Sequence, residues 1–341
     1  MKVLQRLGWS ALALGGSLAV LAGCTAAQAP FEPPMRATAP SAARPVKNTF
    51  GPLVYVASST GCALIRGSIC RAMVSIYTYP TGEYQGKWVD DTGSAARSGT
   101  AGECADNVGN VYVTYSSGAS GKIFEFAHGG TSPIATLSDP TGDPSACSVD
   151  PMTGNLAVVN KTSGSGTLLI YRGGSGTPAV YVAAHSAFSN VGYDNAGNAF
   201  VDGTVGLAEL PEGGSSFRKI ALDRQIESFG SVQWDGQHMT VADFHAHIIY
   251  RFAIIGTNGR EIGSTLLATG LAGERLTQTW IEGNAVVAAN LEPRGCLATC
   301  PGSVNAWSYP NGGLAFRNIG GVGDFANPNG VAISLALDPP R

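Results

Sequence analysis

Charged residues are scarce in this 341-residue chain: they make up 13% of it, while glycine contributes 46 residues. A coiled coil or helical repeat array would be rich in Ala, Glu, Lys, Leu and Arg, and each glycine would destabilise its helices by about 1 kcal/mol relative to alanine. A disordered chain would carry more charge and less than the 44% hydrophobic residues present here. The formal net charge is −3 and the Lys and Arg residues are scattered, so no face that would bind nucleic acid is predicted.

The N-terminus has the three parts of an export signal. Lys2 and Arg6 form a short positive region, and the apolar stretch 7–20 is too short to remain as a membrane-spanning helix. Leu21-Ala-Gly-Cys24 then resembles the lipobox of a bacterial lipoprotein. The resemblance implies cleavage before Cys24 and lipidation of this residue, with several acyl chains that anchor firmly because each buried CH₂ contributes roughly 0.8 kcal/mol. An ordinary secretory signal with a coincidental cysteine, or a membrane-spanning anchor, is the alternative.

The signal divides the chain into three predicted parts: a signal peptide over 1–23, a lipidated tether over 24–49, and a folded domain over 50–341. The tether holds five prolines and no apolar periodicity, which is typical of a flexible to semi-extended linker. Thr25 follows the cysteine where an Asp would retain such proteins in the inner membrane. The resemblance therefore implies an outer-membrane lipoprotein of a Gram-negative bacterium.

One sequence pattern returns five times and predicts a tight hairpin turn. In its best copy a turn of Asp106-Asn-Val-Gly-Asn110 lies between two apolar stretches. In such a turn the Asp side chain accepts backbone N–H groups and the Gly or Asn adopts a positive φ. The acidic residues that open the copies are Asp106, Asp150, Asp194, Asp235 and Glu282. Their spacings of 44, 44, 41 and 47 residues indicate that one structural unit is repeated.

A second turn follows downstream in most periods: an apolar stretch, an aromatic residue or Leu, and then Pro or a small residue with Gly. It occurs at Tyr79–Gly82, Phe126–Gly130, Tyr171–Gly174, Leu210–Gly214 and Tyr309–Gly313. Two hairpins per period give four short strands, the pattern of one β-propeller blade. Leu53–Ala57 aligns with the second strand of a blade, and Asn329–Leu335 reads as the missing innermost strand. We therefore predict an all-β, six-bladed β-propeller, closed by the C-terminal strand pairing into the first blade.

The repeat resembles that of the NHL-repeat propellers, most closely at Gly109–Thr114 and Gly154–Asn160. It is also similar to the six-bladed gluconolactonase and regucalcin-like group and to propeller lipoproteins of environmental bacteria. The resemblance covers 51–337 and implies the architecture, whereas six-bladed propellers host many unrelated functions.

Six cysteines follow Cys24, an even number that favours disulfides in an exported chain. Their positions in the repeat predict the pairs Cys62–Cys70, Cys104–Cys147 and Cys296–Cys300. A metal site or a reactive thiol at Cys296 and Cys300 is the alternative.

Polar residues at one mouth of the predicted channel are the first candidates for a ligand site. They lie where second strands end or innermost strands begin: Glu103, Asn160, Asn190, Asp202, Asp243 and Asn290. Their oxygens could bind a hydroxylated ligand or Ca²⁺, and a solvated polar channel lining is the alternative. In regucalcin-like lactonases this region binds a divalent metal, and Glu103, Asn190 and Asp243 are the nearest counterparts by position. No motif matches, so no catalytic residue is assigned.

A second candidate site is Asp243-Phe-His245-Ala-His247. If this segment were extended, the three polar side chains would share one face and could bind Zn²⁺ with an open position for water. The segment is predicted to be a loop, and ordinary surface residues are the alternative.

The tryptophans recur at strand positions, which predicts packing between blades, with carbohydrate stacking as the alternative. They are Trp88, Trp234, Trp280 and Trp307. No G-x-S-x-G nucleophile motif occurs.

The sequence therefore favours a monomeric, lipid-anchored propeller of the cell envelope that binds a small polar ligand or an envelope protein without catalysis. The alternative is a metal-dependent lactonase or other hydrolase at the channel mouth, with bound metal as the discriminating observation. A purely structural envelope protein is the third possibility.

Overall fold

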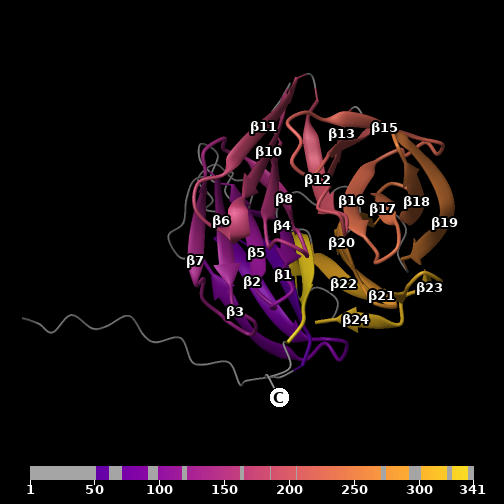
Figure 1. Ribbon diagram of the computed structural model, residues 1–341. Helices are drawn as coiled ribbons and strands as arrows, with labels where there is room; N and C mark the ends of the chain where they lie inside the picture. The colour runs from indigo at the N-terminus through magenta and orange to yellow at the C-terminus, as the bar shows by residue number, and fades with distance from the viewer. Residues whose placement is uncertain are drawn as a thin grey trace, which may run out of the picture. The chain divides into compact units, whose positions relative to one another are not determined.

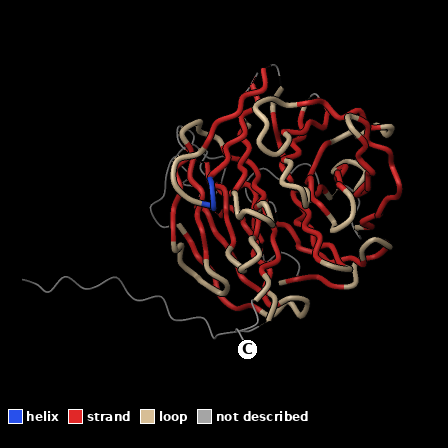
Figure 2. Tube along the Cα trace, in the orientation of Figure 1, coloured by secondary structure: helices blue, strands red, loops and turns tan. Residues whose placement is uncertain are grey.

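The structure of the protein is a computed structural model. It describes residues 51–60, 71–90, 99–116, 121–161, 165–184, 186–204, 206–269, 274–291, 301–320 and 325–336. Nearly all of these residues lie in or between strands, with one 3₁₀ turn at Arg172–Gly174, as Figure 2 shows. In the described part no helix is long and apolar enough to cross a membrane. The signal peptide, the tether, Cys24 and the cysteines 62, 70, 296 and 300 lie outside the described residues.

The repeated Asp turns form as predicted. Asp106 Oδ1 accepts the backbone N–H groups of Val108 (3.0 Å) and Asn110 (2.8 Å), and Gly109 has φ 91°. In the turns that begin at Asp150, Asp194 and Asp235 the Asp side chain likewise accepts the backbone N–H two residues further on, and each turn has a glycine at positive φ. Each turn connects two antiparallel strands, so these contacts set the register of the hairpins.

Three of the sheets are four-stranded and antiparallel. The first contains β26 (Pro328–Ser334), β1 (Leu53–Thr60), β2 (Arg71–Thr78) and β3 (Tyr84–Val89). The second contains β4 (Gly99–Ala105), β5 (Val111–Ser116), β6 (Gly121–Phe126) and β7 (Ala135–Asp139). The third contains β8 (Pro144–Val149), β9 (Leu156–Asn160), β10 (Ser165–Tyr171) and β11 (Ala179–Ala184).

Two sheets are larger. One joins β12 (Phe188–Tyr193), β13 (Ala199–Gly203), β14 (Gly206–Leu210) and β15 (Arg218–Leu222) to β16 (Phe229–Trp234), β17 (Met239–Asp243), β18 (Ile248–Ile255) and β19 (Asn258–Ala268), with β23 (Gly313–Leu314) on β19. The other contains β20 (Arg275–Glu282), β21 (Ala285–Leu291), β22 (Pro301–Ser308), β24 (Arg317–Ile319) and β25 (Phe325–Ala326). The nine-stranded sheet is continuous through the parallel pair β15–β19, so the number of six blades stays a prediction.

The two ends of the described chain meet in the first sheet. β26 pairs antiparallel with β1, from Leu53 opposite Ser334 to Val56 opposite Val331, with a register shift after Ala57. The predicted pairing of the C-terminal strand with the first strand is confirmed. It places a strand on an edge of β1 that would otherwise be unpaired.

Side chains alternate between two apolar clusters along a single strand. Tyr55 of β1 packs in a cluster with strands β5 and β6, whereas its neighbours Val54 and Val56 pack in a cluster with β21 and β22. Burial on both faces explains why β1 is continuously apolar from Leu53 to Ala57 instead of alternating with polar residues.

The strands form successive antiparallel sets, which we call runs. One strand of each run lies next to the equivalent strand of the following run. β26, β4, β8, β12, β16 and β20 contact one another in this order, and β20 contacts β26. We call these six the innermost strands. In Figure 1, β4, β8, β12, β16 and β20 gather towards the middle, and β3, β7, β11, β15 and β19 lie at the periphery.

Candidate functional site

Five of the innermost strands, β4, β8, β12, β16 and β20, line a cavity of about 340 Å³, which we call the central cavity. Its walls are residues 105, 107, 146–149, 151, 190, 191, 193, 231–236 and 278–283. These positions lie in the later halves of β4, β8, β12, β16 and β20 and in the Asp turns that follow them. The cavity therefore lies towards the end of the channel where the innermost strands finish, and the predicted mouth is at their beginning.

Two tryptophans form apolar walls of the central cavity. Trp280 of β20 also packs against three of the apolar clusters, which draw on strands of the first, second, third and five-stranded sheets. Trp234 of β16 packs against the cluster formed within the nine-stranded sheet. Both indoles are half-buried, so each has a packed side and a side that borders the cavity.

Two glutamines bind the innermost strands together around the cavity. Gln278 Oε1 accepts the backbone N–H of Glu103 (2.9 Å) and of Val331 (3.2 Å), and its Nε2 donates to the Glu103 carbonyl (2.6 Å). Gln233 makes the same two-way contact with Ile281, at 2.8 and 2.7 Å. One side chain thus connects β20 to both β26 and β4, and the other connects β16 to β20.

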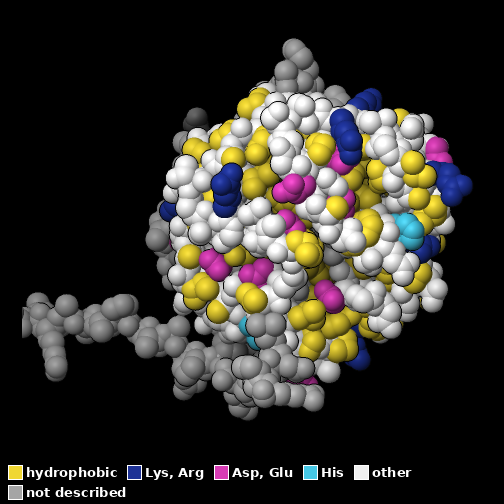
Figure 3. Space-filling view, viewed as in Figure 1, with side chains coloured by type: hydrophobic (Ala, Val, Ile, Leu, Met, Phe, Trp, Pro, Cys, Tyr) yellow, Lys and Arg dark blue, Asp and Glu magenta, His cyan; other side chains and the backbone are white. Residues whose placement is uncertain are grey.

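Two carboxylates complete the polar part of the lining. Asp235 Oδ1 accepts the backbone N–H groups of Gln237 and His238, and its Oδ2 accepts the Tyr309 hydroxyl. Burial raises the pKa of Glu282 above its ordinary value, and an interaction with Trp280 partly opposes this shift. Figure 3 shows acidic side chains gathered around the centre of one face, with the basic side chains further out.

Comparison with known proteins finds similar structures but no matching sequence family. No family model and no curated protein matches the chain. It is similar to a protein of unknown function from Bacteroides caccae, with TM-score 0.57 and 13% identity over 83% of this chain and 99% of that one. A nidogen/laminin complex structure gives TM-score 0.52 and 13% identity, with 83% and 99% covered. The fold is an all-β propeller.

Of the six predicted rim residues, the structure brings Asn190 and Asp202 into contact, and only Asn190 borders the central cavity. Glu103, Asn160, Asp202, Asp243 and Asn290 are each at most 1% exposed. Asn160 Nδ2 donates to Asp139 Oδ1 (3.2 Å), whereas Asn190 donates to Asp202 Oδ1 through Nδ2 (2.9 Å) and its backbone N–H (3.1 Å). The Asn160 and Asn190 amides thus bind carboxylates of the propeller itself, and ligand binding at this rim stays a prediction.

Burial leaves several oxygens of this set without a hydrogen-bond partner among the described residues. They are both carboxyl oxygens of Glu103, Asp202 Oδ2, Asn160 Oδ1 and Asn290 Oδ1. Burial raises the pKa of Glu103 to about 8, and the nearby Ala57 backbone partly opposes this shift. It raises the pKa of Asp202 to about 8 as well, against the hydrogen bonds from Asn190. A buried carboxyl without a compensating charge favours its neutral form.

The predicted histidine site does not assemble. β17 ends at Asp243 and the following residues turn, so the alternation of an extended strand does not apply. The Asp243 carboxylate accepts four backbone N–H groups, those of Glu227, Ser228, His245 and Ala246. In the part of the chain that is described, no three His, Cys, Asp or Glu residues form a group that could hold a metal.

His245 and His247 have separate neighbours. His245 Nε2 lies 3.6 Å from Glu227 Oε2 on the surface, and His247 Nδ1 lies 3.4 Å from Thr269 Oγ1. His247 has φ 56°, in the left-handed region, so its backbone belongs to the turn. These contacts are those of surface residues in a loop, which was the alternative reading of the motif.

The disulfide Cys104–Cys147 is present and joins β4 to β8, as predicted, with 5.6 Å between the Cα atoms. Like the two glutamines, this disulfide connects neighbouring innermost strands. Ser148 Oγ accepts the Tyr193 backbone N–H, which connects β8 to β12.

The tryptophan prediction is confirmed for two residues and incomplete for the other two. Trp307 is fully buried and Trp88 packs on Phe124 and Phe126, as expected for core residues. Trp234 and Trp280 pack on the core and also line the cavity. Trp234 directly precedes Asp235, and Trp280 lies two residues before Glu282, the acidic residues that open two of the repeated turns. This spacing is the sequence pattern from which tryptophans at the cavity could have been predicted.

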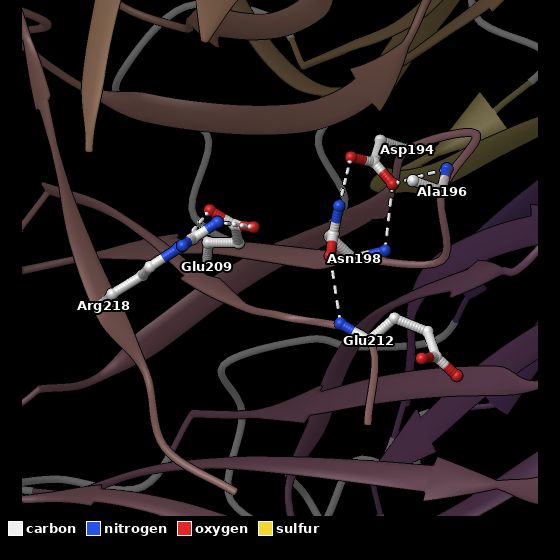
Figure 4. Close-up of polar contacts among 6 residues, drawn as sticks. All are labelled: Asp194, Ala196, Asn198, Glu209, Glu212 and Arg218. Carbon is white, nitrogen blue, oxygen red and sulfur yellow. Dashed lines mark hydrogen bonds and ion pairs between the residues drawn. The ribbon is translucent and has the colours of Figure 1, made fainter. Parts of the chain in front are cut away.

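A second cleft, of about 350 Å³, lies beside the turn that begins at Asp194. Its polar side chains pair with one another, as Figure 4 shows: Arg218 binds both carboxylate oxygens of Glu209 at 2.6 and 2.8 Å, and Asn198 bridges Asp194 to the Glu212 backbone. These pairs explain the polar residues of the cleft as structural contacts, so the central cavity is the better candidate.

Proposed function

We propose that the chain is a six-bladed, lipid-anchored β-propeller whose central cavity binds a small polar ligand without catalysing its conversion. The blade number is supported by dividing the nine-stranded sheet at β15–β19, where only two residue pairs join two antiparallel runs of four strands. That division yields six runs, and their six innermost strands contact one another in a closed order.

The observation that carries the binding function is the composition of the central cavity. Its volume of about 340 Å³ is in the range of small-molecule sites. Two indoles offer flat apolar surface, and amides and carboxylates offer hydrogen bonds, the usual combination in such sites.

The same lining supports a binding role over a catalytic one. No histidine or lysine is among the lining residues. The hydroxyl oxygens of Ser148 and Ser231 accept backbone N–H groups, and Cys147 is in a disulfide. None of these serine and cysteine side chains is therefore a nucleophile activated by an adjacent histidine or lysine of the lining.

Tryptophan fluorescence of the full chain tests the binding function. Titration with neutral disaccharides and other small polar compounds should change the emission, and the change should be lost in Trp234→Phe and Trp280→Phe. Trp88→Phe is the matched control, since Trp88 packs on Phe124 and Phe126 and is absent from the lining. A response that depends on Trp88 alone, or a full response in both cavity variants, would place the site elsewhere.

The proposed anchor is tested separately. The motif Leu21–Cys24 supports lipidation of Cys24 at the cell envelope, with the outer membrane as the proposed location. Cys24→Ser should move the chain from the membrane fraction to the soluble fraction, and a variant that stays membrane-bound would refute lipidation at this residue.

A further inference from the structure

The amide groups of the central cavity have already used part of their donor capacity. Each of the four lining amides donates from its NH₂ group to a protein acceptor. The pairs are Asn107 to the Pro151 carbonyl, Asn190 to Asp202, Gln233 to the Ile281 carbonyl and Gln278 to the Glu103 carbonyl. Donor atoms of these residues are thus held by the propeller itself.

Negative charge is in excess around the same cavity. The carboxylates of Asp235 and Glu282 line it, and no Lys, Arg or His does. Among the described residues, the side-chain oxygens of Asn107 and Asn190 accept no hydrogen bond, and the Glu282 carboxylate has no cationic partner. A ligand that carries positive charge would therefore meet two carboxylates and no competing cationic side chain of the lining.

The apolar walls have the same electrostatic preference. The face of an indole is the negative side of its quadrupole and attracts a cation, most strongly for tryptophan among the aromatic residues. Trp234 and Trp280 supply two indoles to one cavity, within a lining that contains two carboxylates. Both parts of the lining thus favour positive charge.

An anionic ligand would meet the opposite conditions. Its charge would lose hydration on entry and would face two carboxylates without a basic side chain among the lining residues. A neutral ligand avoids this penalty but gains nothing from the carboxylates. The lining therefore discriminates by ligand charge.

We propose that the central cavity selects a small organic cation, with its ammonium group beside Glu282 and Asp235 and its uncharged part against Trp234 and Trp280. This inference rests on the proposed binding function and adds the chemical class of the ligand. Acidic side chains around the centre of the same view in Figure 3 would attract such a ligand from solution.

Choline and its uncharged isostere 3,3-dimethylbutan-1-ol form the matched pair of probes. They have nearly the same shape and differ in charge, so their affinities for the full chain, measured by calorimetry in detergent, isolate the electrostatic preference. Choline should bind at least about tenfold more tightly, and the ratio should fall as salt is added.

Two variants test whether the preference for the cation depends on Glu282. Glu282→Gln should reduce the ratio of the two affinities towards one, whereas Glu83→Gln, an exposed carboxylate outside the lining, should leave it unchanged. If Glu282→Gln fails to fold, the ratio of the two affinities in the unmodified protein still decides whether the cavity prefers a cation.

The possible failures are distinguishable. Equal binding of the two probes, or tighter binding of the neutral one, overturns the cation preference and leaves the binding function intact. If neither probe binds, the cation preference is overturned, and the disaccharide titration followed by Trp234 and Trp280 decides whether the cavity binds a ligand at all. Tight binding of glucuronate at this cavity would also refute the inference.

Discussion

The buried carboxyl of Glu103 should make the propeller less stable as the pH rises. Its pKa is about 8 in the folded chain, compared with 4.5 for the ordinary group, because the side chain is fully buried. Between these two values the folded state holds the proton more firmly than the unfolded state. The stabilisation is therefore complete below about pH 4.5 and is lost as the pH rises through 8.

The size of this effect follows from proton linkage. Within the window the folded state binds close to one extra proton at Glu103, so the free energy of unfolding falls by about 1.4 kcal/mol per pH unit. Asp202, whose pKa is also raised to about 8, contributes a second slope of the same sign. The two slopes add, since the carboxyls have different neighbours: Glu103 lies beside Ala57, whereas Asp202 binds Asn190.

Glu103→Gln removes the titration and nearly preserves the shape of the side chain. Urea unfolding of the variant and the unmodified chain from pH 5 to 8 should show that the variant gains about 1.4 kcal/mol relative to the unmodified chain for each pH unit. Glu83→Gln is the control and should run parallel to the unmodified chain, since Glu83 is exposed. A difference between Glu103→Gln and the unmodified chain that stays constant over this range would refute the reasoning.

Three further predictions concern the contacts between strands. Cys104→Ala should lower the free energy of unfolding by about 2–4 kcal/mol, because the lost bond closes a 43-residue separation, and dithiothreitol should then have no further effect at this site. Gly192→Ala should destabilise the chain by about 1–3 kcal/mol, because its Cβ would lie 2.4 Å from the Val232 carbonyl oxygen; Gly51→Ala, with open space around it, should be neutral in the same thermal melt. Asp194→Ala should cost about 1 kcal/mol by removing two backbone contacts of its turn, and an unchanged denaturation midpoint would contradict that role.

The turns could be predicted from the sequence because their physics is local. The contacts of Asp106 reach only to Asn110, and Gly109 supplies the positive φ inside the same segment. The repeat spacing then places Cys104 and Cys147 at equivalent positions of neighbouring runs, which is why their pairing was also predictable.

The site could not be predicted in the same way because it depends on distant residues. Asn160 is hydrogen-bonded to Asp139, and Gln278 is hydrogen-bonded to Glu103 of the second sheet. A polar residue at a strand end therefore does not indicate that its side chain lies on the channel surface. Trp280 was expected in the core, and only the packing of strands from four sheets decides that one side of it borders a cavity.

The pairing of β26 with β1 has a consequence for the order of events during synthesis. β1 leaves the ribosome among the first strands of the fold and its partner β26 leaves last, so the first sheet stays incomplete until nearly the whole chain is available. Until then β1 presents one unpaired edge, a template for association with other chains. A premature stop before Pro328 would make that edge permanent, so truncated products should be recognised as aggregation-prone and degraded although most of their hairpins can form.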